Sequence, residues 1–166
     1  MASVIRGSDN FDSSEVGKVL QVVSLTSELT FSTTSPTAQN TGISLAITPT
    51  SSTSKVLVIV SASVGAQGIA NPACGIRRDT TIIGAGTAVG SRRSVSSANG
   101  TGEASTVETS PITHLDSPAT TAATTYHITI NARSGFTANI NRSNTNVNNT
   151  YTVNPVSSIT LMEIGA

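Results

Sequence analysis

KVLVIVSASV, the sequence from Lys55 to Val64, decides the fold class because its side chains alternate with a period of two. One side is apolar throughout, and it consists of Val56, Val58, Val60, Ala62 and Val64. The other side changes from Leu57 and Ile59 to Ser61 and Ser63. β-branched residues with this period are typical of a β-strand, in which successive side chains point to opposite faces. We therefore predict a core strand with one fully buried face.

The same period occurs on both sides of this stretch. ISLAIT (43–48) alternates and is joined to 55–64 by a polar connection, which predicts a hairpin with a long loop. Residues 126–133 alternate as well, and 136–140 continue the pattern after the Ser134-Gly135 turn, which predicts a second hairpin. Segments 17–26 and 159–164 are apolar on both faces, as expected of strands between two packed layers.

Glycine and proline mark the connections. IRRDTTIIGAGTAVGSRRS (76–94) predicts two strands joined by the glycine-rich segment 84–90, because it has no helical period. The strand that begins near Thr106 should be interrupted at Pro111, which belongs at an edge or a strand start because it cannot donate a backbone hydrogen bond. Eight to ten strands and no helix longer than a turn favour an all-β fold, an antiparallel β-sandwich or jelly roll.

Composition limits both the partners and the stability of this domain. The 166 residues fit one domain, with 37% hydrophobic, 3% aromatic and 11% charged residues and a formal net charge of zero. Zero net charge argues against nucleic-acid binding, which depends on clustered Lys and Arg. A core of small aliphatic side chains would leave a solitary sandwich marginally stable, so we expect subunits that associate and bury further surface.

The location of the protein is also limited by its sequence. The longest apolar run, 56–60, is far shorter than the roughly 20 residues of a membrane-spanning helix. The first residues contain acids and glycines where a secretion signal would be apolar, so we expect synthesis and assembly in a cytoplasm. Cys74 is the only cysteine and has no partner for an internal disulfide, and we expect it to be buried.

No pattern predicts catalysis, a metal site or a cofactor site. Segment 84–90 superficially matches a phosphate-binding loop, but no helix follows it. His114 and Asp116 would share one strand face, and His127 could join them, yet no metal-ligand spacing occurs and Asp116 fits a turn cap better. There is no GxSxG motif, and a carboxylate pair involving Glu103 or Glu108 stays the one open enzymatic alternative. We expect a protein without enzymatic activity.

Four arginines are candidates for a subunit interface. Arg77-Arg78 and Arg92-Arg93 flank the segment 79–91, and a planar guanidinium suits a bidentate pair with a carboxylate. The acids Asp79, Glu103, Glu108 or Asp116 of a neighbouring subunit could supply that carboxylate. The alternative is solvated surface charge with little effect on stability.

Residues 1–16 differ from the rest and precede a sandwich domain at 17–166. They combine charged and apolar residues among glycine and serine, and we expect an extended arm that becomes ordered when it docks on another subunit through Val4, Ile5, Arg6, Asp9, Phe11 and Asp12. The alternative is a frayed chain end without a function.

Six stretches of this sequence carry a resemblance to a known class. They are GKVLQVVS (17–24), ITPTSSTSKVLVIVSASV (47–64), RRDTTIIGAGTAVGSRR (77–93), LDSPATTAATTY (115–126), NRS (141–143) and SSITLMEI (157–164). Together they resemble trimeric knobs on bacteriophage tail fibres, head fibres and other virion surface proteins, and RGSDNFDSS (6–14) is similar to the start of other small phage structural proteins. The resemblance implies a trimeric jelly roll comparable in shape to tumour-necrosis-factor-like heads.

Two roles in a virion follow from this resemblance. The first is a short homotrimeric fibre or knob on the tail or head, which would touch a host-surface glycan or receptor through loops 65–72, 94–104 and 141–154. The second is a capsid cement or decoration protein, whose trimers stabilise the head. Both imply a homotrimer that binds a tail, neck or major capsid protein, with no nucleic acid and no membrane insertion.

Overall fold

The computed structural model describes residues 17–68, 70–100 and 103–166, and the proposed docking residues Val4, Ile5, Arg6, Asp9, Phe11 and Asp12 lie outside them. The described residues form strands and loops without a helix. The strands are β1 (Val19–Ser27), β2 (Phe31–Thr33), β3 (Gln39–Ile47), β4 (Lys55–Ala66), β5 (Ala73–Arg78), β6 (Thr81–Ile83), β7 (Ser97–Ala98), β8 (Val107–Asp116), β9 (Thr124–Asn131), β10 (Ala138–Ile140) and β11 (Ser157–Ile164).

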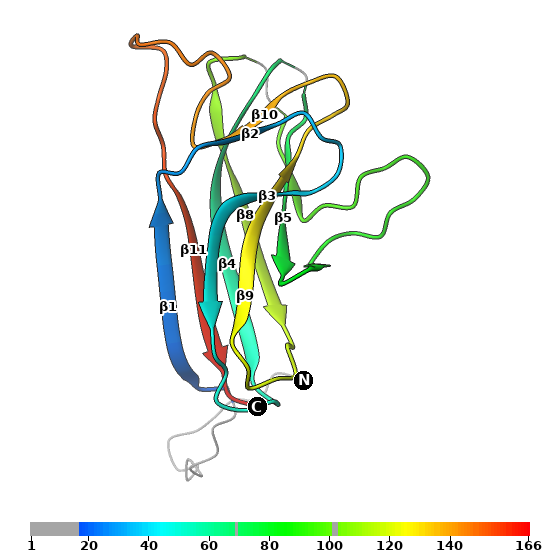
Figure 1. Ribbon diagram of the computed structural model, residues 1–166, viewed down its shortest axis with the longest axis vertical. Helices are drawn as coiled ribbons and strands as arrows, with labels where there is room; N and C mark the ends of the chain where they lie inside the picture. The colour runs from blue at the N-terminus through cyan, green and yellow to red at the C-terminus, as the bar shows by residue number, and fades with distance from the viewer. Residues whose placement is uncertain (1–16, 69, 101–102) are drawn as a thin grey trace, which may run out of the picture.

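The strands form two antiparallel sheets, as the all-β prediction requires. The six-stranded sheet has the order β1-β11-β4-β10-β2, with β8 on the other edge of β4. The five-stranded sheet has the order β3-β9-β5-β6, with β7 also paired to β5. Figure 1 shows the long strands of both sheets running along the long axis of the molecule, with β3 and β9 in front of β4 and β8.

The core lies between the two sheets. The predicted inner side of β4 is confirmed, because Val56, Val58, Val60, Ala62 and Val64 are at most 2% exposed. These side chains belong to one cluster with Ile43, Ile76 and Ile128 of the opposite sheet. Tyr126 is the largest of the fully buried side chains, so the core is otherwise built from small aliphatic groups, as the composition predicts.

Both predicted hairpins between neighbouring strands are wrong. β3 pairs with β9 and not with β4, so residues 48–54 cross from one sheet to the other. β9 likewise does not pair with β10, which lies between β4 and β2. Residues 132–137 make this second crossing, and their course is fixed by hydrogen bonds from the Ala132 amide to the Ser35 carbonyl and from the Arg133 amide to the Ala70 carbonyl. Each crossing lets both strands turn an apolar face to one shared core.

A hairpin does exist within 76–94, but its turn differs from the prediction. β5 and β6 pair from Arg78↔Thr81 onward, so the turn is Asp79-Thr80 and not the glycine-rich segment. Asp79 adopts a positive φ of 50°, which Asp tolerates better than most residues, and its Oδ1 accepts a 3.0 Å hydrogen bond from the Thr125 amide. The segment 84–94 is instead a loop that projects from the sheet, drawn in green at the right of Figure 1.

Two further local predictions are corrected by packing. β8 runs through Pro111 without interruption, and it pairs only with β4, so the missing proline N–H faces away from the sheet. β4 extends past Val64 through Gly65, where glycine is required by a close approach. A Cβ at Gly65 would lie 2.3 Å from the Arg142 carbonyl oxygen.

A buried carboxylate fixes the connection between β3 and β4. Glu163 of β11 is fully buried, and it accepts hydrogen bonds from Gln21 Nε2 (2.6 Å), the Thr50 amide (2.7 Å) and the Thr50 hydroxyl (2.7 Å). Burial alone would raise the pKa of Glu163, but these hydrogen bonds outweigh burial and lower it to about 2. Glu163 therefore stays charged and holds residue 50 against both β1 and β11.

Candidate assembly surface

An apolar row crosses the outer face of the six-stranded sheet. Met162 lies opposite Val22 on one side and Leu57 on the other, and Leu57 lies opposite Leu115. Residues that pair directly across antiparallel strands point to the same face, so these four side chains are neighbours. They turn away from the core because Leu161, next to Met162, is fully buried on the inner face. We call Val22, Met162, Leu57 and Leu115 the apolar row.

Much of this row is open to solvent. Val22 is 52% exposed and Leu115 is 48% exposed, while Leu57 and Met162 are half-buried. Ile59, one step further along β4, is 37% exposed, and Val19 at the start of β1 is 54% exposed. Four neighbouring strands span about 14 Å at an ordinary spacing of ~4.8 Å, so these residues form a continuous patch.

The apolar outer face of β1 is visible in the sequence, but the sequence prediction explained it wrongly. The apolar character of both faces of 17–26 predicted a strand between two layers, whereas β1 is an edge strand whose outer face is open. The outer face of β11 is likewise only half-buried at Thr160 and Met162. An apolar side chain on a face that the chain itself does not cover is a signal for a partner surface.

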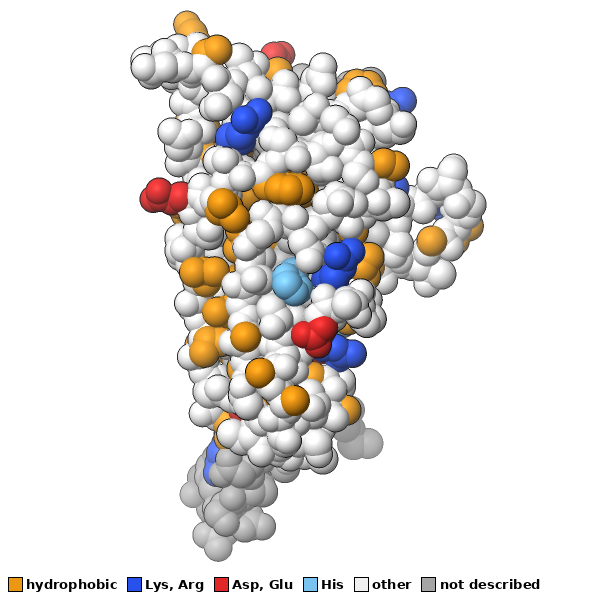
Figure 2. Space-filling model, in the orientation of Figure 1, with side chains coloured by type: hydrophobic (Ala, Val, Ile, Leu, Met, Phe, Trp, Pro, Cys, Tyr) orange, Lys and Arg blue, Asp and Glu red, His pale blue; other side chains and the backbone are white. Residues whose placement is uncertain are grey.

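The outer face of the five-stranded sheet is different. Ser44, Thr125, His127 and Arg77 lie there in register, and Ile82 at its edge is the large hydrophobic side chain that stays exposed, at 42%. In Figure 2, where this sheet is in front, uncharged polar groups cover most of the surface and hydrophobic side chains are scattered between them. The two outer faces of the molecule therefore have distinct chemistry.

Arg78 forms a salt bridge within its own chain. Its Nη1 lies 2.9 Å from both carboxylate oxygens of Asp116, and the Asp116 side chain is 8% exposed. Asp116 also accepts a 2.7 Å hydrogen bond from the Tyr126 hydroxyl. Asp116, which we expected in a neighbouring subunit or at a turn cap, is thus the intramolecular partner that joins β8 to the opposite sheet.

Of the other three candidate arginines, Arg77 and Arg93 bind neutral groups. Arg77 donates to Asn40 Oδ1 (2.9 Å) and to the Ala38 carbonyl (3.1 Å), and Arg93 donates to Asn131 Oδ1 (2.9 Å) and to the Asn71 carbonyl (2.6 Å). Arg92 is exposed on the projecting loop. Arg77, Arg92 and Arg93 have no carboxylate of the described residues within 4 Å, so a contact with acids of another subunit stays a prediction for them.

The three loops expected to face a host meet at one end of the molecule. The Thr145 amide donates to the Ala104 carbonyl (2.9 Å), and the Asn99 amide donates to the Pro72 carbonyl (3.0 Å), so 94–104 links 65–72 to 141–154. Figure 1 shows these loops at the end opposite to the C-terminus. Gly17 lies beside the C-terminus, because its amide donates to the Gly165 carbonyl at 2.7 Å.

His114, Asp116 and His127, which we considered as metal ligands, do not lie together. His114 and Asp116 share the inner face of β8, as expected, but His127 lies on the outer face of the other sheet. No cluster of three His, Cys, Asp or Glu side chains suited to a metal occurs in the described part of the chain. Burial lowers the pKa of His127, and the nearby Arg77 cation lowers it further. Burial raises the pKa of the Cys74 thiol to about 12, so the thiol is protonated at neutral pH.

Among residues 17–68, 70–100 and 103–166, no helix is long and apolar enough to cross a membrane. No family model matches the chain, and no curated protein sequence matches it.

Proposed function

We propose that this chain is a homotrimeric structural protein of a bacteriophage particle, a short jelly-roll knob on the tail or head. Residues 1–16 attach it to the particle, and the loops at its far end are exposed to the host surface. The single observation that carries the proposal is the apolar row on the outer face of the six-stranded sheet.

The strand order supports the jelly roll. The pairs β1·β11, β3·β9, β4·β8 and β5·β6 are nested within one another along the chain, like one long hairpin. The further pairs β11·β4 and β9·β5 close this hairpin into two packed sheets. Rolling up a nested set of antiparallel pairs in this way is how a jelly roll is formed.

The apolar row supports assembly. Covering Val22, Leu57, Leu115 and Met162 with a neighbour would remove apolar surface from water, which contributes roughly 25 cal/mol per Å² before the cost of association. On the side of the row towards Ser24 and Ser61, the outward side chains of β1, β11, β4 and β8 are Ser, Thr, Pro and Ile, while the exposed Lys55 lies on the other side of the row, opposite Ile164. A surface with so few charges suits a second copy of the same chain because it has little charge with which to repel itself. The number three comes from the resemblance to phage knobs.

The ends of the molecule support a role on a particle surface. Residue 17, where the arm joins the domain, lies at the end beside the C-terminus, and the loops 65–72, 94–104 and 141–154 lie at the other end. An arm docked on the particle would therefore direct the loops outward.

The assembly step is tested by the mass of the purified protein in light scattering after size-exclusion chromatography. We expect three times 16.8 kDa, about 50 kDa, at micromolar concentration. Leu57→Asp should give a folded monomer, because a charge in the row loses its hydration when a neighbour covers it. Ala46→Asp, on the polar outer face of β3, is the matched control and should leave the trimer intact. A wild-type monomer, or a Leu57→Asp trimer, would contradict the proposed interface.

The virion role is tested in particles. Deletion of residues 1–15 should leave a soluble trimer that no longer joins the particle, and full incorporation of the truncated protein would contradict the docking arm. Imaging of purified virions then gives the position and copy number. A few dozen copies or fewer indicate a fibre or knob, and hundreds indicate capsid cement.

A further inference from the structure

A hollow lies on the side of the molecule away from the apolar row. It has a volume of about 380 Å³ and separates the projecting loop 84–94 from residues 36–38 at the start of β3. Arg92 and Arg93 line it from the loop, and Ile82 and Pro36 form an apolar wall. A narrow space of about 10 Å³, room for about one water molecule, adjoins it and shares Ile82 and Asn131 with it.

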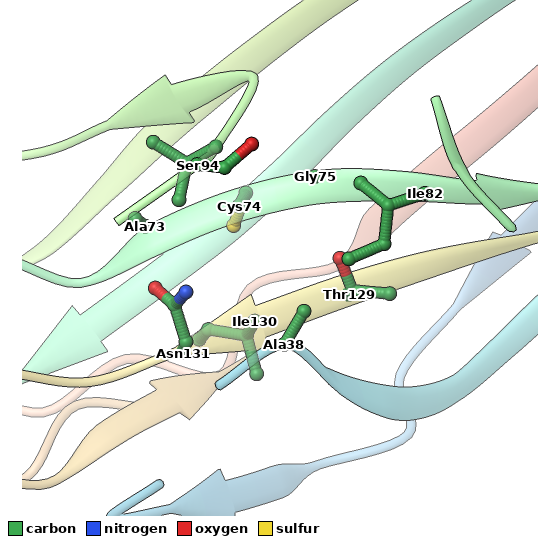
Figure 3. Close-up of a pocket in the computed structure, with 10 residues that line it drawn as sticks. Ala38, Ala73, Cys74, Gly75, Ile82, Ser94, Thr129, Ile130 and Asn131 are labelled. Atoms are coloured by element: carbon green, nitrogen blue, oxygen red, sulfur yellow. The ribbon is translucent and has the colours of Figure 1, made fainter. Parts of the chain in front are cut away.

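Figure 3 shows the narrow space beside the hollow. Thr129 and Asn131 lie on β9, and Cys74 and Gly75 lie on the neighbouring strand β5. Gly75 is closely packed here, since a Cβ there would lie 3.0 Å from the Thr129 hydroxyl and 3.6 Å from the Ser96 hydroxyl. The Ser96 hydroxyl is itself buried without a hydrogen-bond partner among the described residues. Of the residues drawn in Figure 3, Asn131 also lines the hollow, whereas Thr129, Cys74 and Gly75 line only the narrow space of about 10 Å³ beside it.

The hollow carries positive charge that the described chain does not neutralise. Arg93 binds only neutral oxygens, Asn131 Oδ1 and the Asn71 carbonyl. Arg92 has no side-chain hydrogen bond to a described residue. Burial lowers the pKa of Arg93, which is the effect expected when a cation is withdrawn from water without a carboxylate beside it. An anion in the hollow would restore the missing counter-charge.

The walls indicate which anion fits. A guanidinium binds a carboxylate through two parallel hydrogen bonds, and two adjacent arginines can hold one from two sides. The apolar wall at Ile82, which is 42% exposed, suits the C–H face of a sugar ring, and the hydroxyls of Thr37 and Ser91 suit its hydroxyl groups. A volume of about 380 Å³ lies in the range of small-molecule sites and exceeds what a bare inorganic anion would fill.

We propose that this hollow binds an acidic saccharide, whose carboxylate is held by Arg92 and Arg93 and whose ring packs against Ile82. The site lies over the five-stranded sheet, on the opposite side from the apolar row, so it stays accessible when that row is covered. The inference does not depend on trimer formation or on a phage origin, because its walls all come from one chain.

The test is a titration of the full-length protein with methyl glucuronide, followed by isothermal calorimetry or by amide chemical shifts. We expect saturable binding of the glucuronide and none of the matched neutral sugar, methyl glucoside. Arg92→Gln should weaken binding at least tenfold, and it should fold normally because Arg92 is exposed. Arg133→Gln is the control, since Arg133 is an equally exposed arginine that stacks on Phe136 away from the hollow.

Four results would overturn the proposal. If methyl glucoside binds as tightly as methyl glucuronide, the carboxylate is not recognised. If acetate binds as tightly as methyl glucuronide, the sugar ring is not recognised. An Arg92→Gln protein that does not bind the sugar any differently from wild type, or that instead loses its oligomeric state, would show that the arginines serve another purpose, such as pairing with an acid of a neighbouring subunit. The light-scattering result for Leu57→Asp is unaffected by any of these outcomes.

Discussion

The Tyr126 hydroxyl donates a 2.7 Å hydrogen bond to Oδ2 of Asp116, and this contact joins the two sheets of the molecule. Tyr126 is fully buried and Asp116 is 6% exposed. Burial raises the pKa of Tyr126, and the hydrogen bond to Asp116 raises it further, so the phenol remains a donor at every ordinary pH. Arg78 supplies the positive charge that Asp116 needs at this depth.

Removing the cation from this group should cost more stability than removing the phenol. Tyr126→Phe loses one hydrogen bond and should lower the free energy of unfolding by about 1–2 kcal/mol. Arg78→Met leaves a buried carboxylate without a cation and should cost about 3 kcal/mol or more. Chemical denaturation of both variants and of the double variant measures these effects and their coupling. Equal losses for the two single variants would contradict this account of Asp116.

Acid should weaken the fold through Glu163. Its pKa falls from the ordinary 4.5 to about 2 on folding, so the charged form is the one that the native state stabilises. This contribution is complete above about pH 4.5 and is lost as the pH falls towards 2. Wild-type stability should therefore decrease in that window.

The matched variants for this effect are Glu163→Gln and Glu28→Gln. Glu163→Gln should cost about 2 kcal/mol at neutral pH and should lose the wild-type dependence between pH 4.5 and 2. Glu28 is exposed, so Glu28→Gln should follow the wild-type curve. Denaturation at a series of pH values measures both. An unchanged slope in Glu163→Gln would assign the acid sensitivity to another group.

Cys74 should not react in the native protein. Its thiol is fully buried, and with a pKa of about 12 only about one molecule in ten thousand is a thiolate at pH 8. Iodoacetamide should alkylate it in denaturant but not under native conditions, as followed by mass spectrometry. Val89→Cys adds a thiol at a residue that is 61% exposed, and this second thiol should react in the native state. Native alkylation of Cys74 at the same rate would show that the core opens readily.

A charge inside the core should prevent folding. Val58 is completely buried between the sheets, so Val58→Asp would place an unpaired carboxylate there and should abolish the β-sheet circular dichroism spectrum of the soluble protein. Ala46→Asp introduces the same charge on an outward face and should leave the spectrum unchanged. A native spectrum for Val58→Asp would mean that its strand is not in the core.

Strands could be predicted from this sequence, but their partners could not. A period of two predicts β4 from Val56, Val58 and Val60, and it predicts β3 from Ile43, Leu45 and Ile47. Both predicted hairpins failed because a period of two reports which side of a strand is buried and not which strand lies beside it. In this fold the neighbour of β3 is β9, far along the chain, and only packing of the complete core selects it.

The candidate sites show the same limit. The arginine pairs are easy to find in the sequence, but their surroundings are not. The chain turns at Asp79-Thr80, before the glycine-rich segment. As a result Arg78 pairs with Asp116 in the core, while Arg92 and Arg93 lie on a projecting loop. The apolar row was present in the sequence as Val22, Leu57 and Met162. Whether the apolar row lies on an open face depends on the order of the strands in the sheet, and the alternation of apolar and polar residues does not determine that order.

The nested pairing sets the order in which this protein becomes native during synthesis. β11 occupies the second place in the six-stranded sheet, between β1 and β4, and it leaves the ribosome after every other described strand. Until then β1 lacks the one described strand that it pairs with, and Val58 has no Leu161 beside it. Contacts between such distant segments form slowly, so a nascent chain cannot complete the six-stranded sheet before β11 has emerged and must avoid aggregation until that moment.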